Sequence, residues 1–312
     1  MKILKPSEIA KAAALLQQGG LVAFPTETVY GLGASALDGN AVAKIYQAKG
    51  RPSFNPLIAH LANLEAVERI AHMPRKARDL AQAFWPGPLT LVLPKRGTDV
   101  SNLVTAGLDT IAVRVPDHPI ALSLLAQVDV PLAAPSANLS GRVSPTEAAH
   151  VVTDLSNQID AVLDGGATRI GLESTIVDCS KETPRLLRPG GLTLESIEDV
   201  IGALSFLKDS SMAPRSPGQL LSHYAPSALV RLEAKAPIRA EVMIGFGAID
   251  GDLNLSPSGN LVEAAANLFG YLRQADEIAL SNSTERIAIA SIPNAGLGRA
   301  INDRLNRAAA PR

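Results

Sequence analysis

The sequence predicts a layered α/β protein with one large part and one smaller part. Strand and helix signals alternate along most of the 312 residues, a pattern typical of helices packed on a sheet. Hydrophobic residues make up 46% of the chain and charged residues 19%, which is the composition of a folded globular protein. The alternation stops after Gly202 and resumes near residue 242, so the chain divides there.

The first part opens with a helix whose apolar stripe runs from Ile9 to Leu16 and which ends at Gly19-Gly20. A second helix, capped by Asp38, runs to about Gly50. Apolar runs between turn residues predict strands at 21–24, 57–61, 89–93, 110–115, 132–134, 161–163 and 174–178. Helical periodicity predicts two helices between 64 and 84, one at 119–127 and one at 146–155.

The second part follows a stretch, 206–228, that contains several prolines and serines and has no sustained periodicity. Beyond it the pattern predicts a strand at 242–246, a helix over 261–272, a strand at 287–292 and a final helix from about 298. Strand, helix, strand and helix in this order indicate a small Rossmann-like unit. We therefore expect a first domain over 1–205, a linker over 206–228 and a second domain over 229–312.

The overall composition excludes several classes of protein. The 29 basic and 30 acidic residues give a formal net charge of −1, which excludes a protein that holds polyanions by bulk charge. The single cysteine, Cys179, excludes an intramolecular disulfide framework, and its apolar neighbours favour a buried side chain over a nucleophile. No segment approaches the ~20 apolar residues of a membrane span, and the N-terminus does not resemble a signal peptide. We expect a cytoplasmic protein that does not bind membranes.

Some familiar motifs are weak or missing. The segment 31–36, Gly-Leu-Gly-Ala-Ser-Ala, fits a loose dinucleotide fingerprint, but no acidic residue follows it by about 20 positions. We therefore favour a structural glycine turn there. The chain has no P-loop motif. Its five histidines are never four residues apart, so we predict no metal-ligating residues.

Two polar segments are stronger candidates for binding chemistry. Residues 25–33 concentrate hydroxyls, a carboxylate and two glycines directly after a predicted strand, where α/β sheets place ligands. The alternative is an ordinary hydrogen-bonded turn. Lys49 and Arg51 stand at the end of a predicted helix, where two cations around Gly50 suit a clamp for phosphates. The alternative is a solvated helix end whose cations complement the helix dipole.

Residues 135–141 repeat the pattern of hydroxyls and an amide after a short strand, and they either hold a nucleotide or cap a helix. Ser136 does not lie in a Gly-x-Ser-x-Gly elbow, which disfavours a hydrolase nucleophile. Arg114 lies in an otherwise apolar strand. A buried arginine requires an anionic partner, so we expect either a core Asp or Glu or the carboxylate of a ligand.

Read in order, the motifs are Pro-Thr-Glu-Thr-Val-Tyr-Gly-Leu-Gly at 25–33, Lys-Gly-Arg-Pro with Asn-Pro-Leu within 49–57, Pro-Ser-Ala-Asn at 135–138 and Glu-Ser-Thr-Ile-Val-Asp at 173–178. This set resembles the YrdC-type L-threonylcarbamoyladenylate synthases. Ser-Pro-Gly at 216–218, His-Tyr-Ala-Pro at 223–226 and Gly-Arg-Ala-Ile-Asn-Asp-Arg-Leu at 298–305 resemble the linker and the C-terminal helix of their longer, two-domain members. The resemblance spans nearly the whole chain.

The resemblance implies a twisted, mixed, open sheet with helices, followed by a small Rossmann-like domain. It also implies a reaction in which L-threonine, bicarbonate or CO2, and ATP give threonylcarbamoyl-AMP and pyrophosphate. The product would pass to a separate transferase complex that modifies the adenosine next to the tRNA anticodon. Direct binding of tRNA by this chain is then expected to be weak or absent.

The resemblance also assigns residues. Lys49 and Arg51 are expected to be the catalytic cations that face the phosphates. ATP is expected to be held by Arg51, Asn55, Thr110, Ser136, Asn138, Ser144, Arg188 and Tyr224, the last as part of a lid formed by the linker. L-Threonine is expected to be held by Thr28, His60, Arg114, the backbone of Ala134, and Ser174. Mg²⁺ is expected to arrive with ATP.

Two alternative functions remain open at this point. One is a module that binds double-stranded RNA or tRNA without adenylation activity, which salt-dependent RNA binding would favour. The other is a carbamoyl-adenylate enzyme of the hydrogenase-maturation kind. Those proteins are much longer and carry zinc-finger cysteines, whereas this chain has one cysteine.

Overall fold

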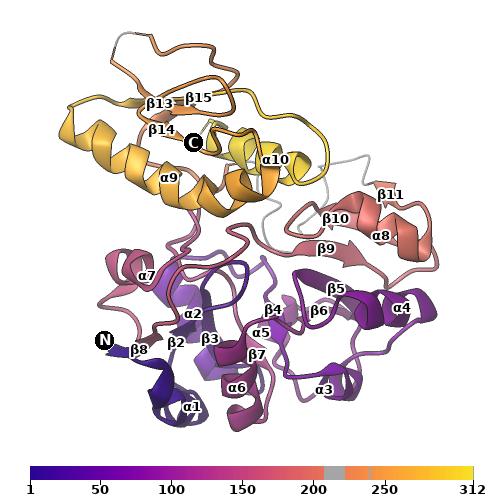
Figure 1. Cartoon of the computed structure of the whole chain (residues 1–312). Helices are drawn as coiled ribbons and strands as arrows, with labels where there is room; N and C mark the ends of the chain where they lie inside the picture. The colour runs from indigo at the N-terminus through magenta and orange to yellow at the C-terminus, as the bar shows by residue number, and fades with distance from the viewer. Residues whose placement is uncertain (207–221, 239, 312) are drawn as a thin grey trace.

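The computed structural model of the chain describes residues 1–206, 222–238 and 240–311 (Figure 1). In this described part, a large mixed sheet and a smaller parallel sheet each carry their own helices. The predicted α/β class, with a mixed sheet and a second, smaller α/β unit, is confirmed. The Ser-Pro-Gly motif at 216–218 and most of the predicted linker lie outside the described residues.

The strands of the large sheet are β1 (Lys2–Leu4), β2 (Val22–Phe24), β3 (Gly31–Ser35), β4 (Ile58–His60), β5 (Leu89–Pro94), β6 (Thr110–Arg114), β7 (Leu132–Ala133), β8 (Ala161–Leu163), β9 (Thr175–Asp178), β10 (Arg185–Arg188) and β11 (Ser205–Phe206). Their order across the sheet is β1-β8-β2-β3-β7-β4-β6-β5-β9-β10-β11. The helices of this part are the 3-10 helix η1 (Pro6–Glu8) and α1 (Ile9–Gln17), α2 (Gly39–Lys49), α3 (Leu64–Ile70), α4 (Arg75–Phe84), α5 (Asn102–Thr105), α6 (Pro119–Val128), α7 (Ala148–Leu155) and α8 (Leu194–Ile201).

The central strands of the large sheet are buried on both faces. Successive residues of a strand point to opposite sides, and β2 shows the consequence. Val22 and Phe24 pack in one core with residues of α1 and α6, whereas Ala23 packs in the larger core on the other side with residues of α2. The strands are therefore apolar along their length, and polar chemistry is left to their ends.

The segment Gly31–Ser35 is a strand, β3, so the predicted glycine turn is wrong. It pairs antiparallel with β2, with Gly33 opposite Val22 and Gly31 opposite Phe24. A Cβ atom at Gly33 would lie 2.9 Å from Cε1 of the Phe24 ring. Glycine is required because an aromatic ring lies against the backbone, which also explains why this motif is not a dinucleotide loop.

The smaller sheet contains β12 (Leu229–Arg231), β13 (Val242–Gly245), β14 (Leu253–Asn254) and β15 (Arg286–Ile289), with α9 (Leu261–Ser281) and α10 (Gly298–Ala308). Its order is β12-β15-β13-β14, and its three strand pairs are all parallel. This arrangement agrees with the predicted Rossmann-like unit. The sequence prediction missed the short strands β12 and β14, as it missed β1, β10 and β11 and the helices α5 and α8 in the first part.

The smaller unit packs directly on loops of the large one (Figure 1). Its hydrophobic core includes Val29, Val143 and Leu172, which belong to the first part of the chain, together with Tyr224 and Phe269. The second unit therefore contacts the loops that follow the strands of the large sheet. Among the helices of the described residues, none has the length and apolar character needed to cross a membrane.

Candidate active site

A closed cavity lies where several strands of the large sheet end. Its walls include His60 at the end of β4, Arg114 at the end of β6 and Arg188 at the end of β10. The other predicted site residues that line it are Arg51, Ala134, Ser136, Ser174 and Tyr224. The volume open to water is about 40 Å³, the space of a few water molecules. The structure thus gathers residues from the motifs at 25–33, 49–57, 135–138, 173–178 and 223–226 around a space smaller than a nucleotide.

Lys49 and Arg51 are buried, so the alternative of a solvated helix end is wrong. Asp38 caps the start of α2, and Gly50 ends it in the left-handed conformation with φ 58°, which turns the two cations inward. Lys49 Nζ donates a hydrogen bond of 2.6 Å to the Ser136 carbonyl and a second one to the Asn138 carbonyl. Arg51 donates from Nε to the Asn55 carbonyl (3.2 Å) and from Nη2 to the Pro56 carbonyl (3.0 Å).

Burial sets the electrostatics of these two cations. It holds the pKa of Lys49 well below its ordinary value, and the neighbouring Arg51 charge lowers it further. Burial likewise lowers the pKa of Arg51 to about 10. In the described structure the hydrogen bonds of both side chains go to main-chain carbonyls rather than to carboxylates. A phosphate group would therefore supply the missing negative charge.

Arg114 has its anionic partner in the core. Its Nη2 lies 2.7 Å from Oε2 of Glu27, and its Nε donates to the Gly87 carbonyl at 3.3 Å. The two side chains are only 4% and 1% exposed. His60 stands beside Arg114 in the register of β4 and β6, and burial together with the Arg114 charge lowers the pKa of His60 to about 3. This wall offers one arginine and one neutral imidazole.

A second buried network holds Glu173, a cavity residue that the sequence prediction did not assign. Ser144 Oγ donates to Glu173 Oε1 at 2.5 Å, and Arg304 Nε donates to Glu173 Oε2 at 2.9 Å. Arg188 Nη2 donates to the Ser174 carbonyl at 2.9 Å. Glu173 is the first residue of the predicted motif at 173–178. A carboxylate within that motif was the sequence signal that could have identified it as a cavity residue.

Tyr224 closes the cavity from the side of the smaller unit. It is 1% exposed, its φ is 61°, and its ring stacks on Phe269 of α9 at 5.5 Å between centroids. The preceding His223 also lines the cavity, and burial lowers its pKa to about 3. The predicted place of Tyr224 over the site agrees with this geometry.

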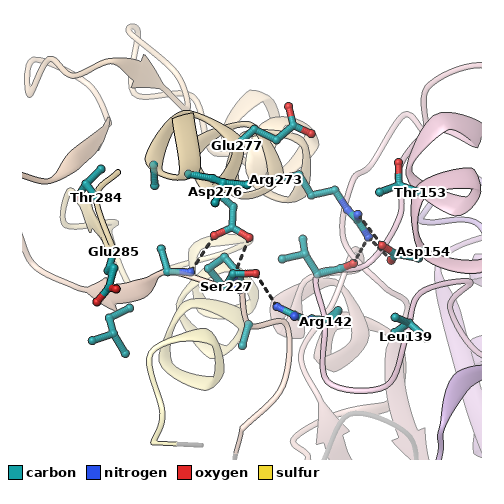
Figure 2. Close-up of a pocket in the computed structure, with 17 residues that line it drawn as sticks. Leu139, Arg142, Thr153, Asp154, Ser227, Arg273, Asp276, Glu277, Thr284 and Glu285 are labelled. Atoms are coloured by element: carbon teal, nitrogen blue, oxygen red, sulfur yellow. Dashed lines mark hydrogen bonds and ion pairs between the residues drawn. The ribbon is translucent and has the colours of Figure 1, made fainter. Parts of the chain in front are cut away.

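The chain after Tyr224 is held in a larger crevice of about 520 Å³ between α7 and α9 (Figure 2). Asp276 of α9 accepts from the amides of Ser227 (2.7 Å) and Ala228 (2.8 Å). Arg273 of α9 pairs with Asp154 of α7 at 2.7 Å. The crevice contains none of the predicted site residues, so we assign the chemistry to the smaller cavity and regard these contacts as anchors of the segment that carries Tyr224.

Several predicted residues do not line the cavity, and Lys49, one of the two predicted catalytic cations, is among them. Ser144 and Thr28 lie behind it: Ser144 holds Glu173, and Thr28 Oγ1 is 2.8 Å from Oγ1 of the lining residue Thr26. Asn55 and Asn138 are buried beside Lys49 and Arg51, and their side-chain oxygens have no hydrogen-bond partner among the described residues. Thr110 is not brought to the cavity, because it lies at the start of β6, about 13 Å along the strand from Arg114.

Two predictions about other chemistry can also be compared with the structure. Cys179 is 1% exposed, and burial raises its pKa to about 12, so the buried interpretation is confirmed. Among the described residues, no three His, Cys, Asp or Glu side chains gather closely enough to hold a metal ion.

Comparison with known proteins identifies the family. Residues 14–190 match a family model described as "Telomere recombination", and residues 192–310 match the model of the threonylcarbamoyl-AMP synthase C-terminal domain. The chain belongs to the threonylcarbamoyl-AMP synthase family. It is 45% identical to the threonylcarbamoyl-AMP synthase of Bacillus subtilis, over 98% of this chain and 94% of that protein. The identity to the enzyme of Pyrococcus abyssi is also 45%, over 96% of this chain and 94% of that protein.

A solved structure agrees over the same length. The crystal structure of P. abyssi Sua5 complexed with L-threonine matches with a TM-score of 0.91 at 43% identity, over 99% of this chain and 98% of that one. The predicted enzyme class, a nucleotidyltransferase that makes threonylcarbamoyl-AMP, is confirmed, and the RNA-binding alternative is not favoured. A full-length HypF structure shares only the fold, with 22% identity and coverage of 29% of its chain.

Proposed function

We propose that the closed cavity is where this chain joins L-threonine, bicarbonate or CO2, and ATP into threonylcarbamoyl-AMP. The observation that supports it is that one cavity gathers Arg51, Arg114 and His60, with Lys49 buried beside Arg51 and hydrogen-bonded to main-chain carbonyls in the described residues. The amine of threonine is carboxylated first, with loss of water when bicarbonate is the source. A carbamate oxygen then attacks the α-phosphorus, and the bond to the bridging oxygen breaks to release pyrophosphate. No covalent enzyme intermediate is required.

In this proposal the two walls of the cavity bind different substrates. Lys49 and Arg51 neutralise charge on the phosphates, where fixed cations in a dry site have their largest effect. The ATP-binding set is completed by Asn55, Thr110, Ser136, Asn138, Ser144, Arg188 and Tyr224. L-Threonine lies against Thr28, His60, Arg114, the Ala134 backbone and Ser174. Thr110 is the member of these sets that the geometry supports least, because of its distance from the cavity.

The small cavity requires an opening step before ATP enters. We assign that movement to the segment that carries Tyr224, which closes the site from the second unit. Closure over the substrates would exclude water from an acyl-phosphate product that hydrolyses readily. The prolines of the predicted linker would lower the cost of ordering it.

The site suits a Mg²⁺ ion that would enter bound to ATP. The carboxylate that lines the cavity in the described residues, Glu173, already accepts from Ser144 and Arg304. The cavity therefore suits an ion held mainly by phosphate and water oxygens, whose contribution is to neutralise the phosphate charge.

We also propose that the product passes to a separate transferase complex that modifies the adenosine next to the tRNA anticodon. The net charge of −1 supports weak or absent tRNA binding by this chain. A cytoplasmic location would bring the enzyme to that tRNA.

The decisive experiment measures pyrophosphate release from ATP and bicarbonate with and without L-threonine. We expect release to require both threonine and bicarbonate. L-Serine should be less effective, because one missing methyl in an apolar niche is worth roughly 1–3 kcal/mol. Equal release without any amino acid would contradict the proposal, and salt-dependent RNA binding without pyrophosphate release would favour the RNA-binding alternative.

A further inference from the structure

Helix α10 of the second unit inserts one charged side chain into the wall behind the active site. Arg304 is completely buried, although it belongs to a helix whose other arginines, Arg299 and Arg307, are partly exposed. Its Nε donates to Glu173 Oε2 at 2.9 Å, and its Nη1 donates to the Pro189 carbonyl at 2.7 Å. Arg304 therefore contacts two segments of the first unit that are remote in sequence.

One of these segments contains the cation Arg188, and the other accepts a hydrogen bond from it. Pro189 follows Arg188 directly, and Glu173 precedes Ser174, whose carbonyl accepts from Arg188 Nη2 at 2.9 Å. Glu173 and Arg188 line the same cavity. Burial lowers the pKa of Arg188, the Arg304 charge lowers it further, and the Glu173 charge raises it. Arg304 thus contacts both the buried carboxylate of the site and the residue that follows one of its proposed phosphate-binding cations.

The same guanidinium group also faces the residue that closes the cavity. The Arg304 guanidinium carbon lies 5.3 Å from the centroid of the Tyr224 ring, within the range of a cation–π interaction. On the other side, Asp303 lies 2.8 Å from Arg304 Nη1. The sequence motif at 298–305 thus contains a residue, Arg304, that contacts the active site although no step of the proposed reaction uses it.

We propose that Arg304 is a positioning residue for ATP binding, which holds the Glu173 carboxylate away from Arg188 so that Arg188 can meet the phosphates. This inference rests on the proposed function, because it takes Arg188 as an ATP ligand. Without Arg304, Glu173 would remain buried beside Arg188 and neutralise it as an internal anion, in competition with the phosphates. The second unit would then contribute to substrate affinity through a side chain that touches no substrate.

The test uses the full chain and measures pyrophosphate release while ATP and L-threonine are varied separately. Arg304→Gln should raise the KM for ATP about tenfold or more and leave the KM for L-threonine within about twofold. The double variant Glu173→Gln/Arg304→Gln removes the competing anion as well and should return the KM for ATP to within about threefold of the parent. If Arg304 had only a structural role, the double variant would not recover. It would bind both ATP and L-threonine more weakly, because two buried partners would have been lost.

Arg299→Gln is the matched control. Arg299 lies on the same helix and pairs with Glu195 of the first unit at 2.6 Å, but the pair is exposed. We expect unchanged kinetics for this variant. If Arg304→Gln does not fold, Arg304→Lys retains the charge and should keep the KM for ATP within about threefold of the parent.

The outcomes separate the inference from the proposed function. An unchanged KM for ATP in Arg304→Gln, or an increase that Glu173→Gln does not reverse, overturns the role of Arg304. A tenfold loss of ATP affinity in Arg304→Lys, with a normal melting temperature, also overturns it. Arg188→Ala with an unchanged KM for ATP would instead contradict the proposed function, since Arg188 would not be an ATP ligand.

Discussion

The buried pair of Arg114 and Glu27 allows stability and substrate binding to be separated by mutation. Glu27→Gln keeps the shape of the side chain but leaves Arg114, 4% exposed, without its carboxylate. Removal of one partner from a buried ion pair costs about 3–5 kcal/mol. In a unit of roughly 200 residues, each 1 kcal/mol shifts the melting temperature by about 2–4 °C, so we expect a fall of roughly 6–20 °C.

The proposed role of Arg114 predicts a second effect of the same substitution. If Arg114 also binds the carboxylate of L-threonine, added threonine supplies Glu27→Gln with the anion that it lacks. The rise in melting temperature caused by saturating threonine should then be larger in Glu27→Gln than in the parent protein. Arg114→Met should lose this rise and increase the KM for threonine by roughly 10- to 100-fold, the cost of a charged hydrogen bond.

The double variant Glu27→Leu/Arg114→Met gives the sharpest result. Replacement of both members of a buried pair by apolar residues of similar size is often neutral for stability. We expect a melting temperature within about 5 °C of the parent, but no response to threonine. A thermal melt with and without L-threonine measures both quantities.

The matched control is Asp117→Asn, which breaks the exposed pair of Asp117 and Arg169, with side chains 51% and 70% exposed. This variant should shift the melting temperature by no more than about 2 °C. The reasoning is refuted if Glu27→Gln melts as the control does. It is also refuted if the double variant responds to threonine as the parent does.

Three further predictions concern the other side of the cavity and its pH dependence. Lys49→Ala and Arg51→Ala should each lower turnover on the order of 10²-fold with little change in the melting temperature, and retained activity with lower stability would contradict the phosphate assignment. Tyr224→Ala should lower both activity and melting temperature because the ring is buried, whereas Tyr224→Phe should keep the melting temperature. His60, whose pKa burial lowers to about 3, should contribute a fall in the free energy of unfolding of about 1.4 kcal/mol per pH unit from pH 6 to 4, because only the unfolded state binds its proton there. The acid-unfolding slope of His60→Gln should be smaller than that of the parent by this amount, with the contribution of His223 retained.

The sequence correctly predicted the elements that have a continuous apolar run or a clear helix cap. Strands such as β5, with five buried residues in succession, and helices with a clear cap, such as α2 after Asp38, appear where expected. The elements that were missed lack such a pattern. β3 reads as a turn because of Gly31 and Gly33, and only the Phe24 ring beside it explains those glycines. Tertiary contacts override local propensity at such places.

The same distinction applies to the active site. Motif residues such as Arg51 and Ser136 were found because each stands within a short recognisable segment, and the cavity brings them together. The pairing of Glu173 with Arg304 spans 131 residues and depends on how α10 packs on the first unit. One sequence signal was available: Arg304 shares the apolar stripe of α10 with Ile301 and Ala308. A charge on the buried face of a helix indicates a buried partner.

The charges of the cavity explain why closure and substrate binding belong together. When the site is closed without ATP, Lys49 and Arg51 are buried against main-chain carbonyls alone, and burial disfavours both of their charged forms. In the proposed function, phosphates beside these cations would remove that penalty, so closure after ATP has entered would be favoured over closure of the empty site. In the described residues, Tyr224 is held in this conformation by contacts with Phe269 and Arg304 of the second unit. In the proposed function, the first unit would therefore supply the cations, and the second unit would supply the low-polarity closure that strengthens their binding of phosphate.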